Sequence, residues 1–492
     1  MKLKDLIKGI ETVNLSGDER TEVSGLSSDS RRVNPGDLFV AIRGGASDGA
    51  DFVSEAIDRG AVAVAASEKI AYLNGNLAQV IVKDPRRALA RMANRLYGEP
   101  AAALRLIGII GTNGKSTVAA LGRGLLQSAG ISAGLLGTIY YGIGQRRLPS
   151  SLTTPPPPEL QILLDSMRKD GATRAVIEVS SHGLKQERLA GCEFDILIFT
   201  NLSPDHLDYH PDINDYRQTK MRPFKTLHQG VKDPGKKTAI VNRDDPVGRK
   251  IIELCRAPVI SYGLDPEADI SASGIVLGPE GSSFRVSYRG EEFRAATPLL
   301  GRHNVYNLLA VIALGLTEGI SLPKILEYLK GAPTIPGRLE AVRGGQDFNL
   351  LIDYAHTPDA LENVITAMKE IYRGELTVVF GCGGDRDRIK RPRMGEIAAR
   401  LADRVIITSD NPRSEDPETI IDEIRAGIPD GFTAIEREAD RRRAIVRACR
   451  LAKPGDVVLI AGKGHEERQI FKDYVIPFSD REEALRAIEE RN

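Results

Sequence analysis

Short apolar runs alternate with longer amphipathic stretches along most of the chain. The runs at 106–110, 175–179, 196–199 and 239–241 are rich in Ile, Val, Leu and Ala, and stretches of helical spacing separate them. Parallel strands that are buried on both faces produce this pattern, with helices as the crossover connections. We therefore expect an α/β protein built on parallel sheets.

The last third of the chain repeats the pattern. Apolar runs at 350–352, 377–380, 404–408 and 457–460 are each followed by a loop rich in Gly, Asp, Asn or His. Ligands of parallel sheets bind at the carboxyl ends of the strands. We expect a Rossmann-like domain here, with a binding site at that edge of its sheet.

Two segments depart from this pattern. Between Asp269 and Thr297 apolar and polar residues alternate one by one, as in Ser283-Phe-Arg-Val-Ser-Tyr288, and the turns are rich in glycine. This predicts an antiparallel appendage. The run Pro155 to Pro158 predicts a rigid extended connector, because proline fixes the backbone in an extended form.

The length of 492 residues corresponds to about three domains at roughly 100–200 residues each. The changes of pattern place boundaries near Ala103 and Gly331. We expect a small N-terminal α/β domain over 1–103, a central P-loop-type domain with the antiparallel appendage over 104–331, and the Rossmann-like domain over 332–492.

Composition excludes several classes of function. The 67 Lys and Arg balance 67 Asp and Glu, which argues against a general nucleic-acid or membrane-surface binder but not against a small anionic ligand. No stretch approaches the ~18 apolar residues of a membrane span, and the start has no long apolar core. Four cysteines form no CxxC pair. We expect a cytoplasmic monomer with reduced thiols, no membrane span and no nucleic-acid partner.

The clearest motif is Gly111-Thr-Asn-Gly-Lys-Ser-Thr117, between the run at 106–110 and a helical stretch at 118–128. Glycines let backbone N–H groups surround a polyphosphate, Lys115 can reach the β- and γ-phosphates, and Ser116 can ligate Mg²⁺. Ile109 replaces the first glycine of the general pattern. The motif predicts an ATP or GTP site, the alternative being a Gly-rich turn without ligand.

Two polar clusters follow neighbouring strands. Glu178 begins the segment Glu178-Val-Ser-Ser-His-Gly183, and His206 lies in the segment Thr200 to His210. A carboxylate and an imidazole at adjacent strand ends suit a Mg²⁺ ion that nucleotide phosphates also bind. From its chemistry alone, Lys220 is either a surface lysine or a phosphate contact, with equal odds.

Three further segments carry candidate residues. His303-Asn-Val-Tyr-Asn307 begins a helix whose continuation at 308–316 is apolar, so capping by Asn304 is the plain alternative to a ligand contact. Pro336-Gly-Arg-Leu-Glu340 and Asp353-Tyr-Ala-His-Thr-Pro-Asp359 lie at and beyond the second boundary.

The phosphate loop resembles that of the Mur ligase and folylpolyglutamate synthetase superfamily, which forms amide bonds with ATP, and the later segments resemble the Mur ligases from end to end. The resemblance implies ATP and two Mg²⁺ ions as cofactors. It implies that Lys220 is carbamylated and that Ser116, Glu178, His206 and Lys220 hold the metal. The implied ATP-site and catalytic positions are Gly111, Thr112, Asn113, Gly114, Lys115, Ser116, Thr117, Glu178, His206, Lys220, Asn304, Asn307, Arg338 and Asp353.

The resemblance is closest to the Mur ligases that add the third residue of the peptidoglycan stem peptide. Ser28-Asp-Ser-Arg31, Gly36 to Ala41 and Gly44 to Gly49 resemble a uridine-nucleotide pocket, although Gly45-Ala-Ser47 departs from relatives with larger polar residues. The resemblance implies UDP-N-acetylmuramoyl-L-Ala-D-Glu as one substrate. Its implied contacts are Ser28, Ser30, Thr153, Thr154, Ser180, Gln186 and Arg188. A guanidinium such as that of Arg188 can bind a carboxylate through two hydrogen bonds.

Asp410-Asn-Pro-Arg413 looks like the recognition motif of these ligases for meso-diaminopimelate, the implied second substrate. This amino acid differs from lysine by an extra carboxylate at its far end. An arginine can bind that carboxylate, whereas the lysine side chain ends in a bare ammonium. A generic Asn-Pro turn is the alternative. The implied contacts are Arg391, Asp410, Asn411, Pro412, Arg413, Gly462 and Glu466.

The resemblance therefore implies that ATP activates the D-Glu γ-carboxylate as an acyl phosphate, which the amine of meso-diaminopimelate attacks. Three other interpretations are less favoured. Arg413 argues against a lysine-adding ligase. A non-catalytic regulator should have lost Lys115, Glu178 or His206, and all three are present. A folylpolyglutamate synthetase does not explain the uridine-pocket segments.

Overall fold

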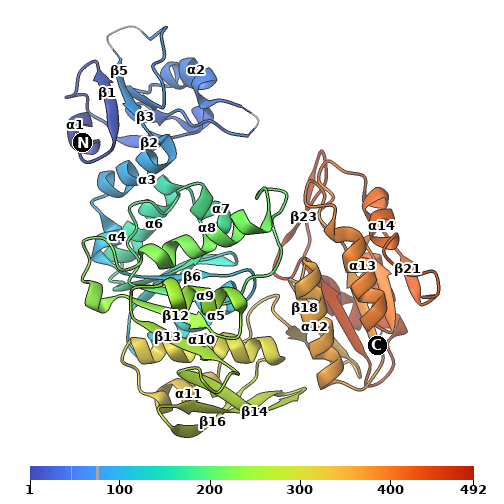
Figure 1. The fold of residues 1–492 in the computed structure, drawn as a ribbon. Helices are drawn as coiled ribbons and strands as arrows, with labels where there is room; N and C mark the ends of the chain where they lie inside the picture. The colour runs from blue at the N-terminus through green and yellow to red at the C-terminus, as the bar shows by residue number, and fades with distance from the viewer. Residues whose placement is uncertain (46, 74–76, 492) are drawn as a thin grey trace.

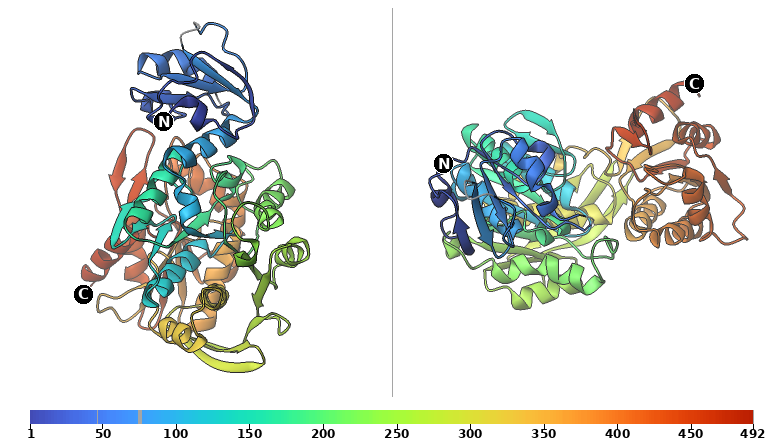
Figure 2. Two further views of the ribbon diagram at one scale, coloured as in Figure 1. Left: turned by 90° about the vertical axis from the view of Figure 1, so that its left-hand side faces the viewer. Right: turned by 90° about the horizontal axis from the view of Figure 1, so that it is seen from above.

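The computed structural model describes residues 1–45, 47–73 and 77–491. It folds into three α/β parts, each with its own sheet and core. The N-terminal part lies at one end of the central part, and the last part lies beside the central part (Figures 1 and 2). The structure confirms the predicted α/β class and its parallel-rich sheets.

The N-terminal part has a five-stranded sheet in the order β1-β5-β4-β3-β2, parallel except for β1. Its strands are β1 (Thr12–Ser16), β2 (Gly25–Ser27), β3 (Asp37–Val40), β4 (Ala63–Ala66) and β5 (Ala78–Val82). Its helices are α1 (Leu3–Leu6), α2 (Val53–Asp58), α3 (Pro85–Leu96) and α4 (Pro100–Ala103), with 3₁₀ turns at Ser30–Arg32 and Gly49–Phe52.

The central part has an eleven-stranded sheet in the order β16-β15-β14-β13-β12-β11-β6-β10-β7-β8-β9. Its strands are β6 (Arg105–Ile110), β7 (Ala133–Leu136), β8 (Tyr140–Ile143), β9 (Arg146–Pro149), β10 (Arg174–Val179), β11 (Ile196–Phe199), β12 (Thr238–Asn242), β13 (Val259–Gly263), β14 (Ile270–Gly278), β15 (Gly281–Tyr288) and β16 (Glu291–Thr297). Its helices are α5 (Lys115–Ser128), α6 (Pro157–Lys169), α7 (Ser181–Lys185), α8 (Ile213–Thr226), α9 (Pro246–Leu254), α10 (Arg302–Thr317) and α11 (Leu322–Lys330), with a 3₁₀ turn at Pro234–Lys236.

Strand β6 is buried on both faces, which explains its unbroken apolar sequence. Ile107 and Ile109 point to one face and pack in the core that α5 and α10 cover. Leu106 and Ile110 point to the opposite face and pack with α6. Successive side chains of a strand alternate between faces, so helices on both sides require apolar residues at every position.

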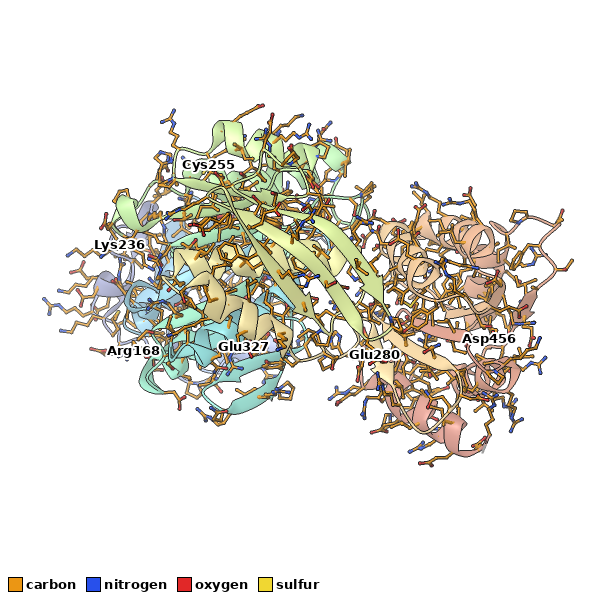
Figure 3. All side chains as sticks on the ribbon, turned by 90° about the horizontal axis from the view of Figure 1, so that it is seen from below. Arg168, Lys236, Cys255, Glu280, Glu327 and Asp456 are labelled. Carbon is orange, nitrogen blue, oxygen red and sulfur yellow. The ribbon has the colours of Figure 1, made fainter. Side chains whose placement is uncertain are left out.

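The predicted antiparallel segment is formed by β14, β15 and β16, which pair in antiparallel register. The three strands are attached to the central sheet and continue it, because β14 pairs with β13. The tip of the β14–β15 hairpin reaches the last part, where Glu280 lies 3.4 Å from Arg343 (Figure 3). At the other edge β8 and β9 form an antiparallel hairpin that the sequence did not predict.

The last part has a six-stranded sheet in the order β17-β18-β22-β19-β20-β21, in which only β17 is antiparallel. Its strands are β17 (Glu340–Val342), β18 (Asn349–Asp353), β19 (Leu376–Phe380), β20 (Arg404–Ile407), β21 (Ile435–Arg437) and β22 (Val457–Ala461), and β23 (Arg468–Ile470) pairs with β24 (Val475–Pro477). Its helices are α12 (Pro358–Ile371), α13 (Lys390–Leu401), α14 (Pro417–Arg425), α15 (Arg441–Leu451) and α16 (Asp480–Glu489).

The proline run does not form the predicted connector throughout. Helix α6 begins at Pro157, so two of the four prolines occupy its first positions. Proline suits this place because its missing N–H would have no partner in the first turn. We propose Ala103 and Gly331 as domain boundaries, since α4 ends at Ala103 and α11 ends one residue before Gly331.

No helix within the described ranges is long and apolar enough to cross a membrane.

A buried ion pair joins the first residues of α15 and α16, two helices of the last part. Arg441 Nε and Asp480 Oδ1 are 2.7 Å apart, and both side chains are fully buried. We expect Asp480→Asn to lower the free energy of unfolding of this domain by about 3–5 kcal/mol, because Arg441 keeps a buried charge without its partner. The control is Glu490→Gln, whose exposed pair with Arg450 spans 3.7 Å. It should change stability by less than about 1 kcal/mol, and equal shifts in thermal unfolding of both variants would contradict the prediction.

Candidate active site

The phosphate loop connects β6 to α5 at the centre of the largest sheet. Gly114 has φ +84° and precedes the first helical residue, Lys115. A β-carbon at Gly114 would lie 2.3 Å from Asn307 Oδ1, so this position requires glycine for both conformation and space. Since the first N–H groups of a helix have no partner within the helix, the loop presents donors to an anion.

Neighbouring strand ends hold the loop in shape. Thr112 N donates to Asn201 O at 2.9 Å, and Asn113 N donates to the Asn201 side chain at 2.9 Å. Thr200 Oγ1 donates to Asn113 O at 2.6 Å. Lys115 Nζ donates back to two loop carbonyls at 3.0 and 2.8 Å, and burial lowers the pKa of its ammonium. The loop is therefore held from the ends of β6 and β11.

Helix α10 packs its first turn against this loop. Asn304 Nδ2 donates to Leu300 O at 2.8 Å, and Asn307 Nδ2 donates to Asn304 Oδ1 at 3.0 Å. The capping alternative for Asn304 is wrong, because α10 begins at Arg302 with Gly301 as its cap, and Asn304 Oδ1 accepts from the Asn307 side chain rather than from a backbone N–H of the first turn. Both asparagines line the cavity described below.

Glu178 is a buried carboxylate at the end of β10. It accepts hydrogen bonds from Ser116 Oγ at 2.9 Å and from the Thr138 N–H and hydroxyl at 2.9 and 3.0 Å. The Glu178 side chain is buried, since only 2% of the residue is exposed. A buried carboxylate beside a serine hydroxyl and a phosphate loop is an oxygen donor set that fits Mg²⁺.

His206 and Lys220 approach the loop from the β11–α8 side. His206 has φ +54°, and burial lowers its pKa to about 4, so its ring is neutral at pH 7. Lys220 is not a surface residue: it is 2% exposed and its Nζ donates to Gly111 O at 2.5 Å. Burial, together with the charge of Lys115, lowers the pKa of Lys220 well below its usual value.

A cavity of about 490 Å³ lies between the central part and the last part. The last part contributes Arg338, Asp353 and Tyr354 to its lining. Arg338 Nη2 donates to Ser116 Oγ at 3.1 Å across the joint. Asp353 accepts from Leu339 N and Ala355 N at 2.8 Å, and burial raises the pKa of its carboxyl group. The phosphate loop and the interdomain residues therefore share one site.

The residues predicted for the muramoyl dipeptide form a second group, of which Thr153 and Ser180 line this cavity. Thr154 Oγ1 donates to Glu178 O at 2.8 Å and accepts from Ser180 Oγ at 3.0 Å. Arg188 donates to Thr154 O at 2.6 Å and to Gln186 Oε1 at 3.1 and 2.7 Å. The hydroxyl oxygens of Thr153 and Thr138 lie 3.0 Å apart. Arg188 lies beyond α7 and is half-buried.

The predicted uridine residues lie apart from the other groups, in the N-terminal part. Ser30 is buried and donates to Glu55 Oε2 at 2.7 Å, whereas Ser28 is exposed. Neither residue lines the interdomain cavity. Ala46 belongs to the segment Gly45-Ala-Ser47, which departs from the relatives in the predicted uridine pocket, and it lies outside the described residues.

The predicted acceptor residues gather at the carboxyl ends of β20 and β22. Asn411 Nδ2 donates to Glu466 Oε2 at 2.7 Å, and a β-carbon at Gly462 would lie 2.7 Å from Asp410 Oδ2. Arg413 has φ +53° and donates to Gly384 O at 2.8 Å, and a β-carbon at Gly384 would lie 1.8 Å from Pro412 O. The tetrapeptide thus places Arg413 against the loop after β19, and a turn follows in which Glu415 N donates to Pro412 O at 3.1 Å.

Arg391 belongs to the same region but faces other groups. Its guanidinium is fully buried and donates to Glu415 at 2.8 Å through both Nη atoms and to Glu423 at 2.6 Å. Both Nη atoms of Arg391 therefore donate to carboxylates of the protein itself. The pair with Glu415 joins Arg391 to the turn that follows the tetrapeptide.

Several residues that the sequence reasoning did not assign lie in these groups. The Tyr354 ring lies 4.9 Å from the Arg338 guanidinium, and its hydroxyl lies 3.5 Å from Glu466 Oε1. Asn113 Nδ2 donates to Asp359 Oδ2 at 2.9 Å across the domain joint. Lys463 Nζ contacts Asn411 and Glu466. Tyr354 and Asp359 lie within the segment Asp353 to Asp359, and Lys463 lies between the predicted contacts Gly462 and Glu466, but only the fold shows which side chain faces which.

The fold and the site together define a nucleotide-binding α/β protein whose central site lies at a domain joint. Three families match the chain: the Mur ligase family catalytic domain over residues 22–97, the Mur ligase middle domain over 109–315, and the Mur ligase glutamate ligase domain over 337–464. The chain belongs to the Mur ligase family.

Curated relatives match the chain along its whole length. It is 42% identical to the UDP-N-acetylmuramoyl-L-alanyl-D-glutamate–2,6-diaminopimelate ligase of Syntrophomonas wolfei over 489 residues, which cover 98% of each chain. It is 42% identical to the ligase of the same name from Geobacillus thermodenitrificans, with 100% of both chains covered. A solved structure of a ligase of this name superposes with a TM-score of 0.69 at 32% identity, covering 100% of this chain and 99% of the other.

The buried histidines predict how stability depends on pH. Burial, together with the positive charge of Arg338, lowers the pKa of His303 to about 4. Between pH about 6.5 and 4 the unfolded chain holds a proton on His303 that the native protein does not, so stability falls as the pH falls through this window.

His303→Gln should therefore lose less thermal stability than the wild type between pH 7 and pH 5. Thermal unfolding of both proteins at the two pH values measures the difference. The same loss in both proteins would contradict a neutral His303 in the native state.

Proposed function

We propose that this chain is the ATP-dependent ligase that joins meso-diaminopimelate to the D-Glu γ-carboxylate of UDP-N-acetylmuramoyl-L-Ala-D-Glu. The observation that carries the proposal is the shared cavity, which the phosphate loop lines together with Thr153 and Ser180 of the central part and Arg338 of the last part. Relatives named for this reaction, 42% identical over the whole chain, support it.

The chemistry requires ATP because a carboxylate is a poor electrophile. A γ-carboxylate oxygen of D-Glu bonds to the γ-phosphorus of ATP, and the bond between that phosphorus and ADP breaks. The amine of meso-diaminopimelate then attacks the acyl carbon, loses a proton and expels phosphate as the amide forms. In this proposal Lys115 and Arg338 stabilise the charge on the phosphoryl group, since catalysis of phosphoryl transfer is mostly positioning and electrostatics.

Mg²⁺ fits the oxygen donors of Ser116 and Glu178. When bound, it would neutralise charge on the ATP phosphates. Among the described residues no group of three or more His, Cys, Asp or Glu side chains could hold a metal ion. We therefore propose that nucleotide phosphates and water complete the coordination, as Mg²⁺ generally prefers. The neutral ring of His206 is the proposed contact from the β11 side.

The environment of Lys220 suits the carbamylation that we propose for it. An amine must be neutral to attack CO₂, and burial lowers the pKa of Lys220 well below its usual value. The attack forms an N–C bond and releases a proton, and the lysine becomes a carboxylate. That negative charge would lie close to the ammonium of Lys115, so the product gains an attraction at the phosphate site.

The acceptor group matches the far end of meso-diaminopimelate in charge. That end carries a carboxylate and an ammonium on one carbon. In this proposal Arg413 binds the carboxylate and Glu466 binds the ammonium, whereas lysine would offer Arg413 no carboxylate. Arg391 supports the turn through Glu415, and its contact with the acceptor stays a prediction. The expectations of a monomer, a cytoplasmic location and no nucleic-acid partner stay predictions.

Phosphate release by the purified protein tests the proposed reaction. With ATP, Mg²⁺ and UDP-N-acetylmuramoyl-L-Ala-D-Glu, we expect rapid release with meso-diaminopimelate and little with L-lysine. Equal or faster release with L-lysine would identify a lysine-adding ligase, and no release with either would overturn the proposal.

Arg413 should determine acceptor affinity. We expect Arg413→Ala to raise the KM for meso-diaminopimelate by at least tenfold and to change the KM for ATP little, because the lost pair costs about 2 kcal/mol or more. Arg413→Lys should recover little, since an ammonium lacks the planar fork. Arg393→Ala, an exposed arginine of the same domain, is the control. An unchanged KM in Arg413→Ala would contradict this role.

A further inference from the structure

Lys463 lies between two glycines in the loop that follows β22, a setting that suits a phosphate contact. The structure shows a different arrangement. The side chain is fully buried, and Lys463 does not line the interdomain cavity. Its Nζ donates to Asn411 Oδ1 at 3.1 Å, to Glu466 Oε2 at 3.0 Å and to Arg468 O at 2.6 Å. An ammonium has three N–H donors, so these acceptors use its full capacity.

Two of these hydrogen-bonding partners, Asn411 and Glu466, belong to the group of residues proposed to recognise meso-diaminopimelate. Asn411 Oδ1 accepts from Lys463 and from Ile470 N at 3.0 Å, while Asn411 Nδ2 donates to Glu466 Oε2. The amide therefore has one orientation that satisfies all its partners. Asn411 follows β20 and Glu466 follows β22, so Lys463 joins the ends of two different strands.

The hydrogen bond from Lys463 also orients the carboxylate of Glu466. Its Oε2 accepts from Lys463 and Asn411, whereas among the described residues its Oε1 has only the Tyr354 hydroxyl, at 3.5 Å. The Glu466 side chain is 31% exposed and that of Lys463 is 0% exposed. The cation thus lies behind the carboxylate, and Oε1 keeps capacity for a further donor.

The backbone of the loop determines this direction. Gly462 has φ +108° and Gly464 has φ +54°, and a β-carbon at Gly464 would lie 2.7 Å from Tyr354 Cβ. The glycines let the loop turn sharply on either side of Lys463 while it packs against the segment after β18. The same turn that brings Glu466 to the site sends Lys463 into the domain.

Resting on the proposed function, we propose that Lys463 is a positioning residue for acceptor recognition. It contacts neither ATP nor the acceptor. It fixes Asn411 and Glu466 as one recognition face for the ammonium of a diamino acid. Without the buried cation, the amide can rotate and the carboxylate loses the partner that holds it in place.

The test compares Lys463→Met with the wild type in steady-state kinetics for all three substrates. We expect the KM for meso-diaminopimelate to rise about tenfold, as for the loss of a hydrogen bond between charged groups. The KM values for ATP and the UDP-linked substrate should stay within about twofold. Lys463→Gln, which keeps a donor, should recover part of the affinity. The control is Lys453→Met, an exposed lysine of the same domain.

A merely structural role would change the KM values for all three substrates equally. This result in Lys463→Met would overturn the proposal. If Lys463→Met does not fold, the same result in Lys463→Gln would overturn it. An unchanged KM for meso-diaminopimelate would also overturn it. As a second measurement, Lys463→Met combined with Glu466→Gln should raise that KM by less than the product of the single effects; a full product would count against a shared face. A wild type that does not use meso-diaminopimelate overturns the proposed function itself.

Discussion

The turn from β6 into α5 is the constraint on which the rest of the structure depends. At Gly114 the backbone has a positive φ. The side chain of Asn307 in α10 lies so close that a β-carbon at Gly114 would clash with it. Lys220 of α8 and Arg338 of the last part reach the same turn and its first helical residues. Residues separated by more than two hundred positions therefore meet around one loop, because strand ends and helix starts converge at one edge of the sheet.

The buried charges around this loop show how the site differs from an ordinary core. Glu178 is buried among hydroxyl and amide donors, and Lys220 is buried above the Tyr216 ring at 4.7 Å. Burying unpaired charges costs free energy, and proteins accept this cost mainly where chemistry requires it. In the last part, by contrast, Lys463 is buried with all its donors satisfied, which suits a residue that holds other side chains in place.

The sequence predicted the strands of the site closely, because buried parallel strands leave an unbroken apolar run. The predicted run 196–199 coincides with β11, and the other runs differ from their strands by one or two residues. The proline run was misjudged in part, since proline suits the first turn of a helix as well as an extended connector. The antiparallel strands were predicted, but their union with the central sheet depends on the pairing of β14 with β13, which no local pattern encodes.

The sequence by itself determined the fold class, the phosphate loop and the segments that supply the site, since these depend on local periodicity and on spacing along the chain. Only the tertiary structure decided which side chains of those segments face one another. It placed Lys220 in the interior beside Gly111, engaged Arg391 with Glu415 and turned Lys463 away from the cavity. The reason is physical: the direction of a long side chain depends on partners from distant segments, and those partners meet only when the sheets form.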